Sequence, residues 1–355
     1  MSGYNYVNDS DSRHIEKIAT RDRKLMLVMS DHQLDEHQKS FLRIIESFSR
    51  NLAAKESSYR GFSFTHIKSF VFHSNEINVS VVKNGDSYYI GCTELFVSLL
   101  KRSFFRIASM TKIMPGLTGE EFVASAPLGL IPPNRSDGYD SDIPENRVRQ
   151  YLALMMSEIA IRFSVAHEIG HILHQRARAS ATFYLDEIAS AASGIDLDRH
   201  ADEIQADTFA ATWIAENVNK KLMRMDTLES EMGRKISEKE YCELYIHSIY
   251  ILFSLFSIES KSGHSISSHS KSHPSPISRL LAIMKTVLLP EVHLSDINRS
   301  LMREVILSAQ DNVAPFLRIM DVKDPVYTEA DIEMFHNHLN DIYRLIESRA
   351  SSENG

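Results

Sequence analysis

Cysteine is scarce in this chain of 355 residues, which holds only Cys92 and Cys242. The two cysteines lie far apart and form no C-x-x-C pair, which excludes a disulfide framework and a cysteine-based zinc site. An excess of positive charge is also missing, because 39 lysines and arginines stand against 47 aspartates and glutamates. A general nucleic-acid-binding protein needs a basic surface, so we expect no nucleic-acid partner.

Long apolar runs are missing as well, and we expect no leader segment. Only residues 244–258 resemble a membrane span, and they fall short of the roughly 20 apolar residues that a span needs. We interpret them as a buried helix, and a membrane anchor at 244–258 is the alternative. The first 12 residues contain no apolar stretch typical of a signal peptide, so we expect a cytoplasmic protein.

The chain does contain a series of helical patterns around one short β-rich region. Residues 64–91 alternate, and Asn84-Gly85-Asp86 separates two strand-like runs, which predicts a hairpin. Thr93 is suited to cap a helix that follows the hairpin. Apolar side chains recur at helical spacing in residues 12–56, 147–178, 197–220, 238–258 and 278–349. These patterns predict an α+β fold that is mainly α.

An H-E-x-x-H pattern, His167-Glu168-Ile169-Gly170-His171, lies in the predicted helix 147–178. The spacing of four residues places both imidazoles on one helix face, where both can bind one zinc ion. Glu168 is rotated by about 100° from His167, so it can act on a water molecule as a general base without binding the metal. The alternative is a helix whose two histidines satisfy ordinary hydrogen bonds.

A catalytic zinc site needs a third protein ligand. The three-histidine form of the motif fails because Ala177 stands where its last histidine belongs. Glu187 and Glu203 are the candidates, and Asp207 favours Glu203. It lies one helical turn after Glu203 and can accept the outer N–H of a ligating histidine, whereas Ala191 in the matching place after Glu187 cannot. A solvated acidic helix face is the alternative for Glu203 and Asp207.

HEIGH followed by DEIQADTFAA resembles the gluzincin metallopeptidases, whose third zinc ligand is a glutamate on a later helix. Two gluzincin groups are similar to this chain: the HtpX/Oma-type peptidases, and the ImmA/IrrE-type peptidases of phage and stress circuits. The multiple membrane helices of the first group and the DNA-binding module of the second are not evident here. The phage-exclusion Lit-type peptidase, a soluble zincin that cuts a translation factor, is similar in length and in its mid-chain zinc motif.

His273-Pro274 and Arg279 resemble the His-Pro…Arg element of the HtpX/Oma-type group. The resemblance implies that Arg279 stabilises the oxyanion or holds a neighbouring carboxylate, and that His273 donates a hydrogen bond nearby. The alternative is a turn at His273 and a surface position for Arg279.

These observations predict a zincin-like metallopeptidase domain over residues 63–290, between helical segments at 1–62 and 291–355. We expect a small β-sheet or hairpin beside the active-site helix, with an edge strand that holds an extended protein or peptide substrate. His167, His171 and Glu203 bind Zn²⁺, and Glu168 takes a proton from the water that attacks the peptide bond.

Two other interpretations stay open. One is a catalytically silent zinc-binding interaction protein, which a fourth protein ligand such as His264 or His269 would favour. The other is a latent peptidase in phage defence or stress response. Its control would act at two predicted loops, residues 115–146 and the Ser/His-rich residues 257–276.

Overall fold

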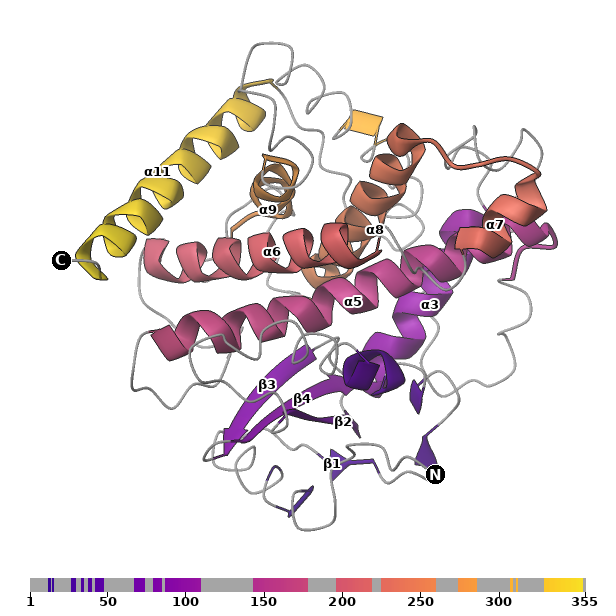
Figure 1. Ribbon diagram of the computed structural model, residues 1–355, viewed down its shortest axis with the longest axis horizontal. Helices are drawn as coiled ribbons and strands as arrows, with labels where there is room; N and C mark the ends of the chain where they lie inside the picture. Colours follow the sequence, from indigo (N-terminus) through magenta and orange to yellow (C-terminus); the bar gives the residue numbers. More distant parts are fainter. Residues whose placement is uncertain are drawn as a thin grey trace. The chain divides into compact units, whose positions relative to one another are not determined.

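The computed structural model shows a mainly helical protein that also contains a small sheet (Figure 1). Its chain divides into two compact units, residues 1–100 with 178–186 and residues 101–177 with 187–355. The domain boundaries predicted from the sequence, at 62/63 and 290/291, stay predictions. The structure describes residues 12–13, 15, 27–29, 33–34, 38–39, 42–47, 67–73, 79–84, 87–109, 143–177, 196–218, 225–259, 274–285, 307–308, 311 and 329–353.

The first unit contains a four-stranded sheet in the order β1-β2-β4-β3. The predicted hairpin is confirmed, because β3 and β4 pair antiparallel with Asn84 opposite Ser87. β4 also pairs in parallel with β2, where Ile67 lies opposite Tyr88. The strands are β1 (Leu27–Val28), β2 (Ile67–His73), β3 (Val79–Asn84) and β4 (Ser87–Thr93). The predicted placement of a sheet beside the active-site helix stays a prediction.

Strand β1 lies within the segment 12–56 that the apolar spacing predicts as helical, and there the prediction is wrong. Leu27 and Val28 pair antiparallel with His73 and Phe72 of β2. The N–H and C=O groups along the open edge of β2 need partners, and this pairing outweighs a weak local preference for helix. Residues 42–47 of the same segment are helical, as predicted.

Helices α3 (Glu94–Ala108) and α5 (Arg147–Ala177) begin close to their predicted places. The hydroxyl of Thr93 accepts a hydrogen bond from the backbone N–H of Phe96 at 3.1 Å, which is the predicted helix cap. Arg149 of α5 is fully buried and donates from Nη1 to the carbonyl of Ala108 at 2.8 Å. That contact satisfies a carbonyl in the last turn of α3, which has no partner within its own helix.

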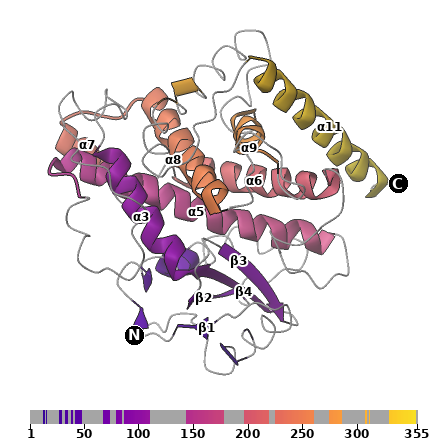
Figure 2. The ribbon, with the colours of Figure 1, turned by 180° about the vertical axis from the view of Figure 1, so that it is seen from behind.

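Helix α5 forms the centre of the second unit and packs against α6, α7 and α8 (Figures 1 and 2). Helix α9 packs against α6 and α8, and α11 packs against α6 and α9. None of the described helices, α8 included, has the length and hydropathy to cross a bilayer. The helices are α6 (Leu197–Val218), α7 (Met225–Met232), α8 (Glu238–Glu259), α9 (Pro276–Ile283) and α11 (Glu329–Glu353).

Gly170 allows α5 and α6 to approach each other closely. A Cβ atom at position 170 would lie 2.9 Å from the Cα and 3.2 Å from the carbonyl oxygen of Ala206. Both are backbone atoms, so they cannot turn aside as a flexible side chain can. Ala201 and Ala210 of α6 are also fully buried, and their small side chains allow close helix packing.

Replacing Gly170 by alanine is therefore expected to destabilise the protein, and replacing it by valine to destabilise it more, with a loss of about 1–3 kcal/mol for valine. The comparison is informative because glycine to alanine inside a helix otherwise stabilises by about 1 kcal/mol. The measurement is the free energy of unfolding from urea titration. An alanine variant more stable than the wild type would show that the α5–α6 contact is not tight.

Candidate metal centre

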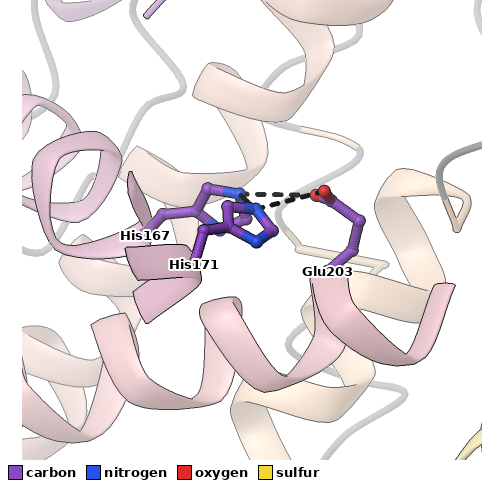
Figure 3. Close-up of side chains that lie close together, drawn as sticks. All are labelled: His167, His171 and Glu203. Carbon is purple, nitrogen blue, oxygen red and sulfur yellow. Dashed lines mark hydrogen bonds and ion pairs between the residues drawn. The ribbon is translucent and has the colours of Figure 1, made fainter. Parts of the chain in front are cut away.

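Helices α5 and α6 bring the three predicted metal ligands together (Figure 3). The Nε2 atoms of His167 and His171 lie 3.0 Å apart. Glu203 places Oε2 at 3.4 Å from Nε2 of His167 and Oε1 at 3.2 Å from Nε2 of His171. All three side chains are buried. Among the residues that the structure describes, these three form the single group of three or more histidines, cysteines, aspartates or glutamates that could hold a metal ion.

The spacing of these atoms suits a tetrahedral zinc ion. Ligand atoms about 2.0–2.1 Å from zinc at tetrahedral corners lie about 3.3 Å from one another. The distance between the two imidazole nitrogens, 3.0 Å, and the two distances from these nitrogens to the carboxylate oxygens, 3.2 and 3.4 Å, agree with that value. Two imidazoles and one carboxylate are also the donor set of many catalytic zinc sites. The residues therefore fit the ion predicted from the sequence.

Asp207 lies one turn after Glu203 on α6 and contacts the outer side of the His167 ring. Its Oδ1 is 2.8 Å from Nδ1 of His167, and its side chain is fully buried. A proton on Nδ1 directed at this carboxylate leaves Nε2 bare, which is the form of histidine that binds a metal. The carboxylate thereby selects the tautomer and the orientation of the ring.

Arg279 of α9 holds Asp207 through two hydrogen bonds. Its Nε donates to Oδ2 and its Nη2 donates to Oδ1, both at 2.7 Å. The same Nη2 is 3.7 Å from Oε2 of Glu203. The sequence predicts two alternative roles for Arg279. This bidentate geometry is the one required by the second role, in which Arg279 holds a neighbouring carboxylate.

The charges around His167 favour a cation at this centre. Burial by itself disfavours a protonated ring, but the carboxylates of Asp207 and Glu203 outweigh it and raise the pKa of His167 to about 10. Burial lowers the pKa of His171; Glu203 opposes this effect, whereas the neighbouring His167 ring adds to it. The pKa of Asp207 is lowered because Arg279 and His167 outweigh the effect of its burial. A metal ion would thus replace a proton that the acidic side chains already attract.

The other predicted residues are placed only in part. Glu168 follows His167 in α5, and the residue is 7% exposed. His273, the alternative ligand Glu187, and the loop histidines His264 and His269 lie outside the described residues, as do most of the two predicted loops. The described chain resumes at Pro274, and Ser275 caps α9 by accepting a hydrogen bond from the N–H of Ser278.

Two phenylalanines that the sequence interpretation did not single out form an apolar wall beside the centre. Phe163 stacks on the ring of His167, with ring centroids 6.3 Å apart. Phe253 of α8 meets Phe163 edge-on at 5.7 Å, and the guanidinium of Arg279 lies 4.2 Å from the Phe253 centroid. Phe163 stands one turn before His167, so helical spacing could have identified it. Nothing in the local sequence marks Phe253.

Comparison with known proteins gives one family. Residues 121–298, half of the chain, match the family described as Peptidase U49, a Lit-type peptidase family. The matched segment contains α5, α6 and α9, and so every residue of the candidate centre. No protein of curated function and no solved structure matches the chain.

Proposed function

Because this chain belongs to the peptidase U49 family, we propose that it is a zinc-dependent endopeptidase with a zincin-like core of the gluzincin type. One observation carries the proposal: within the matched segment, His167, His171 and Glu203 converge in a buried site at the spacing of zinc ligands. The substrate class follows from the family, because a peptidase acts on a protein or a peptide.

The proposed chemistry assigns a distinct task to each side chain. His167, His171 and Glu203 hold the ion, which when bound polarises the peptide carbonyl and lowers the pKa of a water molecule to about 7. Glu168 accepts a proton from the attacking water and passes it to the leaving amine as the C–N bond breaks. Asp207 and Arg279 keep the ring of His167 in its ligating orientation.

The biological setting that we propose rests on the family alone. A latent peptidase in phage defence or stress response agrees with membership of a Lit-type family. A cytoplasmic location stays a prediction from the sequence. A catalytically silent zinc-binding protein remains the alternative, and it would show the same metal content without cleavage of any substrate.

The test is the zinc content of the purified protein, measured for the wild type, Glu168→Gln, Glu203→Ala and Glu333→Ala. Glu333 is an exposed glutamate of α11 and serves as the matched control. We expect about one zinc per chain in the wild type, Glu168→Gln and Glu333→Ala. In Glu203→Ala we expect zinc affinity to fall by at least about 100-fold. No bound metal, or equal binding in all four proteins, would remove the basis of the proposal.

A further inference from the structure

Helix α11 lies outside the segment that matches the family, yet it packs against two helices that carry the metal centre. It contacts α6, which holds Glu203 and Asp207, and α9, which holds Arg279 (Figures 1 and 2). Phe335, Leu339 and Ile342 are buried and follow helical spacing, so they form the inner face of α11. This helix therefore belongs to the packing that positions the ligands.

Polar contacts add to this interface at several points. Arg349 pairs with Asp198 and Asp202 of α6. Lys285, two residues after α9, lies 4.3 Å from the ring centroid of Tyr343. Asp198 is largely exposed, and pairs of this kind contribute little to stability.

A partly buried polar contact between α11 and α6 is formed by a pair of histidines. Nε2 of His338 lies 2.9 Å from Nδ1 of His200, and the two rings are perpendicular. His200 is fully buried and stands three residues before Glu203 on α6. Two ring nitrogens at this distance need one N–H donor and one bare acceptor. The contact thus ties α11 to the turn of α6 that precedes the ligand.

We propose that His338 is a positioning residue for Glu203: through His200 it holds α6 where Glu203 meets His167 and His171, and acid releases this hold. The inference rests on the proposed function, because Glu203 is its metal ligand. It adds a residue that the family match does not reach.

The effect of acid follows from the hydrogen bond between the two rings. When the pair takes up one proton, one ring becomes charged and the other ring still has a bare nitrogen that accepts the hydrogen bond. A second proton removes that acceptor and charges both rings, whose facing nitrogens lie 2.9 Å apart. Burial lowers the pKa of His338, and Asp341 acts in the opposite direction. An undocked histidine titrates near pH 6.5, so below about that pH the undocked pair binds more protons than the docked pair. The free energy of docking therefore falls as the pH falls.

Three acidic side chains of α6 and α11 have arginine partners of their own. Asp198 and Asp202 of α6 are engaged with Arg349. Asp341 pairs with Arg344 on the exposed side of α11. Charged groups on the elements that form this interface include Asp198, Asp202 and Glu203 on α6, Lys285 after α9, and Asp341, Arg344 and Arg349 on α11.

The experiment compares the zinc affinity of the full chain between about pH 8 and pH 5.5 for the wild type, His338→Gln and His338→Ala. Glutamine retains a donor and an acceptor but takes no charge. Protonation of the metal ligands weakens zinc binding in every variant, so the ratio of dissociation constants, variant over wild type, isolates the effect of position 338. His336→Gln on the same helix is the matched control.

For His338→Gln we expect a ratio near one at about pH 8 that falls to about 0.1–0.3 near pH 5.5. For His338→Ala, which loses the hydrogen bond, we expect roughly tenfold weaker binding at about pH 8. Ratios near one for both variants at every pH, or the same change in His336→Gln, would overturn the proposal.

A second measurement separates this inference from the proposed function. Trp213 is the one tryptophan of the chain and lies buried on α6, so its fluorescence reports on that helix without a metal. In metal-free protein, the acid transition of this fluorescence should move to lower pH in His338→Gln. Absence of zinc binding by the wild type would refute the proposed function but not the contact role of His338. An unchanged transition in His338→Gln would end the role of His338.

Discussion

Replacing Glu168 by glutamine is expected to abolish peptide-bond hydrolysis while zinc stays bound. Glutamine has nearly the shape of glutamate, so His167, His171 and Glu203 keep their geometry, but its amide cannot accept the proton of the attacking water. Removal of a general base typically costs 10²–10⁴ in rate, and we expect about 10³-fold or more in kcat. The measurement is mass spectrometry of new protein N-termini after incubation of the protein with a cell lysate.

Glu333→Gln provides the matched control for this experiment, because it makes the same chemical change at an exposed position. New N-termini that appear with the wild type and the control, and not with Glu168→Gln, identify the substrate. Equal cleavage by Glu168→Gln would refute the assignment of the general base. Full zinc content with no cleavage by any of the three proteins is the result that the silent zinc-binding protein, and equally a latent peptidase without its trigger, would give.

Replacing Arg279 by methionine is expected to weaken both the fold and the metal centre. The change leaves the fully buried carboxylate of Asp207 without its bidentate partner. Breaking a buried ion pair from one side typically costs about 3–5 kcal/mol. Loss of an outer partner of a metal ligand lowers metal affinity by about 10–100-fold. Urea unfolding of the metal-free protein and zinc titration measure the two effects.

A double-mutant cycle with Asp207→Asn shows whether Arg279 acts through Asp207. If it does, the double variant loses little more than the worse single variant, because both changes break the same contact. Arg279→Lys keeps the charge but not the fork of two donors, so we expect an intermediate loss. An Arg279→Met variant that keeps its stability and zinc affinity but loses activity would instead support the oxyanion role.

Several parts of the structure follow from spacing along the chain. The run from Arg147 to Ala177 is helical because apolar residues repeat with the helical period, and the same period brings His167 and His171 onto one face. The β3–β4 hairpin and the Thr93 cap likewise depend on neighbouring residues alone. The proximity of Asp207 to Glu203 also needs only one turn of helix.

Other features depend on contacts between segments that no local pattern connects. Nothing in the period of residues 12–56 predicts that Leu27 and Val28 pair with β2, since a strand edge elsewhere in the chain supplies the partner. The parallel pairing of β2 with β4 has the same origin. Local preferences differ by less than about 1 kcal/mol per residue, so tertiary pairing readily outweighs them.

The division is clearest at the candidate metal centre. The sequence alone determined which residues can act as ligands, because residue type and helical spacing settle which donors share a helix face. That α6 crosses α5 closely enough at Gly170 for Glu203 to reach both histidines depends on the packing of the folded chain. The tertiary structure also decided that Arg279 reaches Asp207, that Phe253 lies beside them, and that His338 meets His200. These contacts join residues far apart in the chain, and they depend on how side-chain volumes fill the space between helices rather than on any repeat along one of them.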